Sequence, residues 1–230
     1  MQSYQLARLC EWLASLIGRC APLNSKLGQR QNFADTVCVM TTTEPERIAV
    51  LLLAGGRATR FGGGKLLQDL GGKPLGFHAA ENLAALDLPI RIAVHGTDTP
   101  DLAALGFSPL PLDPADAPLS RSIGIGIGAA EKAGADAVLI ALADMPLVPT
   151  RHFRALIDAF NGDCTATQVN MRAMVPAIMG KRYFSALVQL SGDRGAQSLL
   201  SGKSVVVLSQ ELAIDIDTPD DLLAARRHLL

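Results

Sequence analysis

The sequence predicts an α/β fold, in which a mostly parallel sheet is covered by helices on both faces. Strongly aliphatic runs at 48–53, 90–94 and 137–142 are typical of strands buried in the interior of a parallel sheet. Segments with helical spacing of apolar residues follow each run, and this alternation of strand and helix is the order found in α/β proteins. We expect helices at 74–86, 122–133 and 150–160.

The first aliphatic run, 48–53, ends abruptly at Gly55 and Gly56. In α/β folds the crossovers are right-handed, and the loops after the carboxyl ends of the strands form the ligand crevice. Polar residues that directly follow strands are therefore the candidates for chemistry. Three segments meet this condition: 55–65, Asp144 after the run at 137–142, and 215–217 after a late strand predicted near Leu212.

Composition restricts the class of protein. The chain has 230 residues, of which 49% are hydrophobic and 19% charged, as in a globular domain with a substantial core. Its formal net charge of -1 provides no general field that would attract a polyanion. Nucleic acid is therefore not an expected partner, and any anion site must be local.

The four cysteines indicate a reducing compartment. Cys10, Cys20, Cys38 and Cys164 are widely scattered and form no CxxC pair, so neither a zinc site nor a disulfide framework is indicated.

The early apolar stretch at 13–17 follows no basic leader and is too short to span a bilayer. We expect a cytoplasmic protein without a membrane partner.

Residues 1–45 differ in pattern from the rest of the chain. An amphipathic helix is predicted there, followed by a polar linker at 24–35, so we divide the chain into an extension at 1–45 and one domain at 46–230. The extension is either a docking or dimerisation arm, or a dispensable segment preceding a start at Met40. The helical spacing is carried by Leu6, Leu9, Leu13, Leu16 and Ile17.

The segment 53–65, with the sequence LAGGRATRFGGGK, has the properties of a phosphate-binding loop. Glycines allow backbone amides to approach oxyanions, and the three cations of the segment can neutralise a triphosphate. It is not a P-loop, because Lys65 is followed by Leu66, which has no hydroxyl for magnesium, and it contains no GxGxxG. A flexible surface loop is the alternative. The candidate catalytic cations are Arg60 and Lys65, and the candidate nucleotide-binding residues are Leu53, Ala54, Gly55, Gly56 and Arg57.

Three acidic residues are candidate ligands of Mg²⁺. Asp144 follows a buried strand and should face the crevice, where a hard oxygen ligand can hold the ion against phosphates. Asp215 and Asp217 are two residues apart and would share one face of a strand. The alternative for Asp144 is a helix cap. A helix is expected to begin after Thr218, with Pro219 in its first turn.

The segment 120–128 carries Ser120 and Ser122 and then three alternating glycines inside a predicted helix. Glycine is unfavourable within helices, so each needs a reason. Close approach of a nucleotide base is one explanation, and tight packing of the helix on the sheet is the other. Both serines are candidate nucleotide-binding residues.

Four segments in this order resemble one enzyme family: the loop at 53–65, ADMP at 143–146, GDRGA at 192–196 and DIDTPDDL at 215–222. Together they are similar to the molybdenum cofactor nucleotidyltransferases, closest to the cytidylyltransferases, and to related sugar-phosphate nucleotidyltransferases. The resemblance covers 47–230 and implies a three-layer α/β/α Rossmann-like nucleotidyltransferase fold that uses Mg²⁺.

The resemblance also implies two further site residues. Asp113 lies where the similar enzymes carry an acidic residue near the nucleotide, although between prolines it could instead shape a turn. Arg194 lies in the segment that would face the acceptor, where it could contact a phosphate. The alternative for this segment is a loop between two helices, with Asp193 as the cap of the second.

The reaction that the resemblance implies is attack of an acceptor phosphate on the α-phosphorus of a nucleoside triphosphate, with release of pyrophosphate. The acceptor would be molybdopterin or the molybdenum cofactor, and a molybdoenzyme or its chaperone a further partner. The segments at 192–196 and 215–222 favour CTP, whereas LAGG at 53–56 is the guanylyltransferase spelling. We rank CTP ahead of GTP. The alternatives are a GTP-specific guanylyltransferase, a sugar-phosphate nucleotidyltransferase and a non-catalytic nucleotide- or cofactor-binding chaperone.

Overall fold

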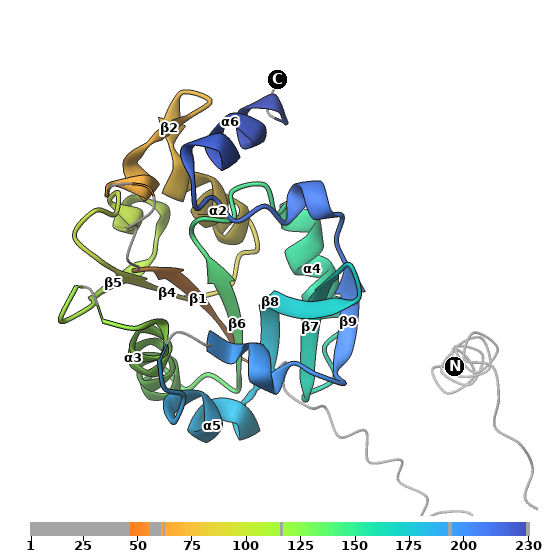
Figure 1. Ribbon diagram of the computed structural model, residues 1–230. Coiled ribbons are helices and arrows are strands. Elements are labelled where there is room, and N and C mark those ends of the chain that lie inside the picture. Colours follow the sequence, from red (N-terminus) through yellow and green to blue (C-terminus); the bar gives the residue numbers. More distant parts are fainter. Residues whose placement is uncertain (1–46, 56–60, 62, 116, 193–194, 229–230) are drawn as a thin grey trace, which may run out of the picture. The chain divides into compact units, whose positions relative to one another are not determined.

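Seven strands form one mostly parallel sheet, with the order β5-β4-β1-β6-β8-β7-β9 (Figure 1). The computed structural model describes residues 47–55, 61, 63–115, 117–192 and 195–228. Only β8 runs antiparallel to its neighbours, so the predicted α/β fold is confirmed. The strands are β1 (Ile48–Ala54), β4 (Ile90–His95), β5 (Ser108–Pro111), β6 (Ala137–Leu142), β7 (Cys164–Val169), β8 (Arg172–Gly180) and β9 (Ser204–Val207).

Strand β1 lies near the centre of the sheet because its side chains are apolar on both faces. All seven of its residues are buried, and it pairs in parallel with β4 on one side and β6 on the other. Alternate residues enter opposite cores: Val50 and Leu52 pack on one face, and Leu51 and Leu53 on the other. Leu51 lies between Ile92 of β4 and Ile140 of β6 in the ladder.

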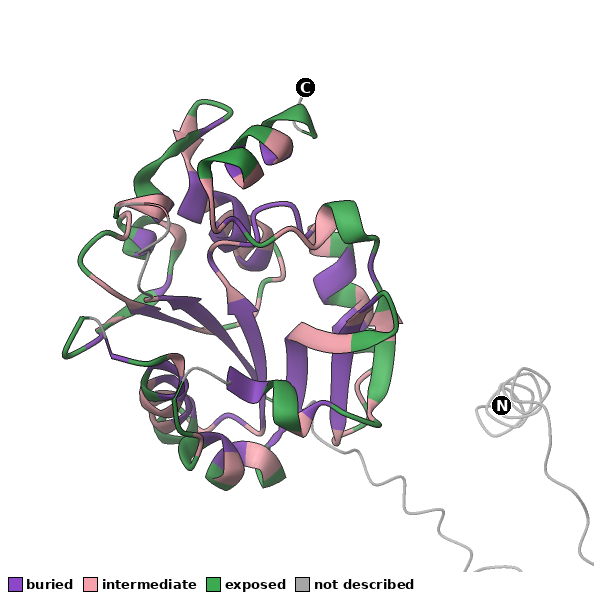
Figure 2. Cartoon of the chain, viewed as in Figure 1, coloured by how far each residue is buried: buried purple, intermediate pink, exposed green. Residues whose placement is uncertain are grey.

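Helices cover both faces of the sheet, which confirms the three-layer α/β/α architecture. One apolar core includes Leu83 of α2, Phe153 of α4 and Leu222 of α6, and the other includes Ile123 of α3 and Leu187 of α5. Figure 2 shows the strands buried between these layers, with exposed residues on the outer faces of the helices. The helices are α2 (Leu75–Ala84), α3 (Leu119–Lys132), α4 (Thr150–Asp158), α5 (Phe184–Val188) and α6 (Pro219–Arg227).

Short elements complete the domain. A two-stranded hairpin is tied to α6, because the guanidinium of Arg226 donates to the carbonyl of Asp69 at 2.8 Å. The hairpin consists of β2 (Asp69–Leu70) and β3 (Lys73–Pro74), and the 3-10 helices are η1 (Lys65–Leu67), η2 (Leu102–Leu105), η3 (Lys181–Tyr183), η4 (Gly195–Leu199) and η5 (Gln210–Leu212).

The strand predicted near Leu212 is wrong. Residues 210–212 form η5, and 213–217 have no regular structure. After β9 the chain leaves the sheet, and the amide of Ile216 donates to the carbonyl of Asp144 at 3.0 Å. Because this segment crosses the carboxyl end of β6 instead of joining the sheet, alternation along a strand cannot be the reason that Asp215 and Asp217 share a face.

The three glycines of α3 have different surroundings. A Cβ on Gly126 would lie only 2.2 Å from Leu51 Cδ1, so this glycine allows α3 to pack closely on the sheet. Gly124 and Gly128 instead line an open groove, and a Cβ on Gly128 would meet nothing within 4 Å. Tight packing therefore explains only the middle glycine.

Three further sequence predictions can be compared with the structure. The amphipathic helix and linker at 1–45 lie outside them. Within the described residues, no helix combines the length and apolar character needed to cross a bilayer. The helix expected after Thr218 is confirmed as α6, with Pro219 as its first residue.

Candidate active site

Lys65 and two aspartates from distant parts of the chain meet at the carboxyl edge of the sheet. The Nζ of Lys65 lies 2.7 Å from Asp144 Oδ2 and 3.2 Å from Asp217 Oδ1. Gly63 and Gly64 have φ angles of 98° and 61°, and this left-handed turn directs the chain into η1, which begins with Lys65. The Lys65 side chain is only 12% exposed, so its charge is held inside the edge of the domain.

Asp144, Asp215 and Asp217 form a cluster suited to a divalent ion. Each can offer one carboxylate oxygen, and these oxygens lie within 4.8 Å of one another. Asp144 Oδ1 is buried and has no hydrogen-bond partner among the described residues, although buried polar atoms almost always have one. Carboxylate oxygens are the ligands that hard cations prefer. The donor set therefore fits Mg²⁺ or a similar ion, and the Lys65 ammonium pairs with two of its members.

The charges of this cluster shift two pKa values. Burial lowers the pKa of Lys65, but attraction to Asp144 and hydrogen bonding outweigh it, so the pKa is raised and the ammonium stays protonated. The pKa of Asp215 is raised to about 7, first because protein atoms displace water around its carboxyl group and then because Asp144 and Asp217 repel its negative charge. The residue as a whole is exposed, but its carboxylate oxygen lies within 4.8 Å of those of Asp144 and Asp217. A bound cation would oppose that shift.

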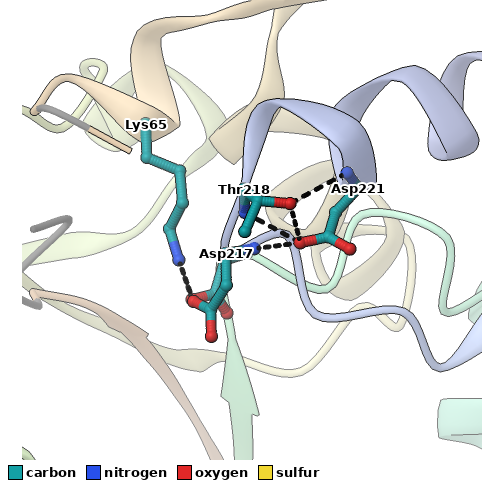
Figure 3. A network of polar contacts seen from close by, with 5 residues as sticks. Lys65, Asp217, Thr218 and Asp221 are labelled. Atoms are coloured by element: carbon teal, nitrogen blue, oxygen red, sulfur yellow. Dashed lines mark hydrogen bonds and ion pairs between the residues drawn. The ribbon is translucent and has the colours of Figure 1, made fainter. Parts of the chain in front are cut away.

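The start of α6 holds Asp217 in place (Figure 3). Asp221 Oδ2 accepts hydrogen bonds from the amides of Asp217 and Thr218 at 3.1 and 2.8 Å, and from the Thr218 hydroxyl at 2.8 Å. The Thr218 side chain in turn accepts from the Asp221 amide, which completes a capping box. These contacts lower the pKa of Asp221, so its carboxylate remains ionised. Asp221 is therefore a positioning residue for Asp217.

The loop after β4 supports the glycine-rich segment. Thr99 Oγ1 donates to the Ala54 carbonyl at 2.9 Å, and Asp98 Oδ2 accepts from the Gly64 amide at 3.2 Å. Sequence reasoning missed Asp98 and Thr99. The signal for both was available, because they follow the strand that was expected at 90–94.

Ser122 faces the end of β1. Its Oγ lies 3.6 Å from the position that a Cβ on Gly55 would take, and it is fully buried without a hydrogen-bond partner. Within the described residues, three buried side-chain nitrogen or oxygen atoms lack a partner, and two of them, on Ser122 and Asp144, lie at this edge of the sheet. An unsatisfied hydroxyl there is available to a ligand.

Asp113 and Ser120 lie in a different setting, along a groove of about 1120 Å³ on the outer side of α3. Asp113 is exposed, whereas Ser120 is buried and its amide donates to the Gly192 carbonyl at 3.3 Å. The groove is also lined by Arg121, Gly124 and Val188.

The remaining predicted site residues fall into two groups. The side chains of Leu53 and Ala54 are buried in the cores, where they anchor the end of the strand that precedes the loop. Their carbonyls accept hydrogen bonds from the Ala143 amide and the Thr99 hydroxyl. Gly56, Arg57, Arg60 and Arg194 lie outside the described residues, and their roles stay predictions.

Known proteins resemble this chain in sequence over most of its length. A domain described as the MobA-like NTP transferase domain matches residues 50–209. The chain is 30% identical over 195 residues to a molybdenum cofactor guanylyltransferase from Rhodobacter capsulatus, covering 80% of this chain and 97% of that protein. It is 28% identical over 198 residues to the purine catabolism protein PucB of Bacillus subtilis, covering 78% of this chain and 96% of that protein.

Solved structures agree on the fold. A nucleotidyl transferase from Methanothermobacter is 22% identical, covers 79% of this chain and 97% of its own, and superimposes with a TM-score of 0.66. The family match extends from β1 to the end of the sheet, and the chain carries a lysine and a carboxylate cluster at the edge where α/β proteins bind ligands. The protein is a nucleotidyltransferase and belongs to the MobA-like NTP transferase family.

Proposed function

We propose that this enzyme transfers a nucleoside monophosphate from GTP to the phosphate of molybdopterin or the molybdenum cofactor, releasing pyrophosphate. The observation that carries the proposal is the Lys65–Asp144–Asp217 cluster at the carboxyl edge of the sheet. The donor follows from the relatives, since the guanylyltransferase of Rhodobacter capsulatus matches over nearly its whole length. This ranks GTP ahead of CTP, the reverse of the order expected from the sequence.

The proposed chemistry needs charge neutralisation and alignment more than a general base. An acceptor phosphate is already a nucleophile, so an oxygen of this group forms the new bond to the α-phosphorus while the bond to pyrophosphate breaks. Asp144, Asp215 and Asp217 would hold a divalent ion, which would neutralise phosphate charge. The Lys65 ammonium would turn from the carboxylates to a phosphate oxygen, whose negative charge would replace theirs as its partner.

The buried Ser122 hydroxyl is suited to contact the nucleoside. It faces Gly55, whose lack of a side chain leaves room for Leu112: a Cβ on Gly55 would lie 2.9 Å from Leu112 Cδ2. Ser122 also follows the first turn of α3, so the amides of that turn are nearby. We include Ser122 in the nucleotide site, with Gly55 as its opposite wall.

The test is pyrophosphate release by the full chain with each of the four nucleoside triphosphates and molybdopterin. We expect release with GTP, in the presence of Mg²⁺, and a loss of about a hundredfold or more in Asp144→Asn. Asp136→Asn is the matched control, because Asp136 precedes the same strand, β6, at its opposite end and pairs with Arg47. Equal loss in both variants would contradict the assignment of Asp144.

CTP is the second candidate donor. It is favoured by GDRGA at 192–196 and DIDTPDDL at 215–222, the segments that resemble the cytidylyltransferase branch. The same assay decides between the two bases, because only the preferred triphosphate should give release at low concentration. Release with a sugar phosphate in place of molybdopterin would refute the acceptor. A cytoplasmic location and delivery of the product to a molybdoenzyme or its chaperone belong to the same proposal.

A further inference from the structure

The Lys65 ammonium holds two of the three carboxylates that fit a divalent ion. Its Nζ pairs with Asp144 and Asp217, and Figure 3 shows the side chain extending from η1 toward Asp217. An oxygen ligand lies about 2.1 Å from Mg²⁺, so an ion on Asp144 Oδ2 would lie within about 5 Å of this ammonium. Both charges are positive, and because the lysine side chain is only 12% exposed, solvent screens their repulsion weakly. The ammonium and the ion therefore compete for the same oxygens.

A displaced ammonium would lose its partners. Within the part of the chain that the structure describes, Asp144 and Asp217 are the acids that form ion pairs with Lys65. Breaking a largely buried ion pair from one side is costly, because it leaves an uncompensated charge in a position that water reaches poorly. An ion that takes these oxygens must therefore also bear the cost of leaving the lysine unpaired, unless another anion is present to receive it.

The backbone at Lys65 is fixed, so the exchange needs only a movement of the side chain. The Gly64 amide donates to Asp98 Oδ2 at 3.2 Å, and the Gln68 amide donates to the Lys65 carbonyl at 3.2 Å. Leu66, the next residue, is buried in the core that includes α2. Lysine carries its charge on a flexible four-carbon stem. Rotation about these bonds can move the ammonium by several ångströms while η1 stays in place.

One oxygen of the cluster remains open to an entering ion. Asp144 Oδ2 holds Lys65, whereas Oδ1 of the same carboxylate is buried and has no hydrogen-bond partner among the described residues. An ion can therefore contact Oδ1 before the ammonium leaves Oδ2. Binding of an ion to the protein alone should accordingly be weak but measurable.

We propose that Lys65 is a built-in counter-ion, exchanged for the divalent ion when a triphosphate offers its ammonium a new partner, so that nucleotide and ion bind cooperatively. This inference rests on the proposed function, because it needs the phosphates of the donor at this edge of the sheet. With a triphosphate present, Nζ rotates to a phosphate oxygen and frees the oxygens of Asp144 and Asp217. By linkage, the ion must strengthen nucleotide binding by the same factor as the nucleotide strengthens ion binding.

The test measures GTP binding to the full chain by calorimetry without acceptor, in EDTA and at saturating Mn²⁺. We expect the factor by which Mn²⁺ strengthens GTP binding to be about tenfold larger in the wild type than in Lys65→Met, where no ammonium has to be displaced. GTP also chelates Mn²⁺ in solution, but this contribution is the same for both proteins and cancels in the comparison. The lysine is therefore the source of any difference.

Titration of Mn²⁺ into the protein without nucleotide isolates the competition. Lys65→Met should bind Mn²⁺ about tenfold more tightly than the wild type, whereas Lys65→Arg, which keeps a cation beside the carboxylates, should bind it weakly. Lys73→Met is the matched control, because Lys73 pairs with Glu81 outside the cluster, and its affinity for Mn²⁺ should equal that of the wild type. Circular dichroism shows whether each variant is folded.

Two results would overturn the proposal. One is equal affinity of the wild type and Lys65→Met for Mn²⁺, and the other is an effect of Mn²⁺ on GTP binding that is no larger in the wild type than in this variant. Binding of Mn²⁺ to the protein alone involves neither GTP nor molybdopterin. A wrong donor or acceptor would therefore abolish pyrophosphate release and still leave the tighter Mn²⁺ binding of Lys65→Met, which supports the lysine exchange.

Discussion

Replacing Gly126 by alanine should destabilise the domain, although alanine is the better helix former. A Cβ at this position would lie 2.2 Å from Cδ1 and 2.7 Å from Cδ2 of Leu51, whereas ordinary contacts begin near 3.4 Å. Leu51 is fully buried and has strands on both sides, with Ile92 and Ile140 beside it in the ladder. It cannot move aside freely, so α3 must shift by roughly 1 Å in a close-packed core.

The expected magnitude follows from two opposing effects. Overpacking of a core costs about 1–3 kcal/mol, and removing a glycine from a helix contributes about 0.5–1 kcal/mol in the other direction. The net loss should be about 1.5 kcal/mol, which for a domain of this size corresponds to a decrease in Tm of roughly 3–6 °C. Thermal unfolding followed by circular dichroism measures this directly.

Gly128→Ala is the control in the same helix. A Cβ there would meet nothing within 4 Å, so only the helix propensity changes and the Tm should rise by roughly 2 °C. The reasoning would be refuted if Gly126→Ala were as stable as the wild type, or if both variants changed Tm in the same direction. The first result would mean that α3 and β1 are packed more loosely than the structure shows.

Two further predictions concern the candidate active site. Lys65→Met should lower pyrophosphate release by about a hundredfold or more. The same variant should bind Mn²⁺ more tightly in calorimetry, because the ammonium no longer competes for Asp144 and Asp217. Weaker Mn²⁺ binding would contradict a site shared by the lysine and the ion. Asp215, with a pKa raised to about 7, holds a proton in the metal-free folded state that the unfolded chain releases near pH 4. Its contribution to stability therefore falls as pH rises from about 4 to 7, so Asp215→Asn should raise the Tm in EDTA at pH 8 but not at pH 3.5. An equal rise at both pH values would exclude titration of Asp215 as the cause.

Local patterns in the sequence determined most of the fold. The aliphatic runs at 48–53, 90–94 and 137–142 are strands because only apolar side chains can fill both faces of a buried parallel sheet. The start of α6 at Pro219 follows from Thr218 and the acids after it, which satisfy the first amides of a helix within a few residues. The family could be identified because its motifs are short, contiguous segments of this kind.

The arrangement of the candidate site depended on contacts that no local pattern contains. Lys65 pairs with Asp144 and Asp217, which are 79 and 152 residues away in the sequence, and the segment around Asp217 reaches them as an irregular chain, not as the strand that spacing suggested. The sequence likewise could not show which glycine of α3 touches the sheet, since that depends on the rotation of the helix against Leu51.

Sequence by itself determined the elements and the kinds of side chain at their ends, because these follow from interactions between near neighbours. Only the tertiary structure decided which of those side chains meet, because packing between layers fixes the distances between residues far apart in the chain.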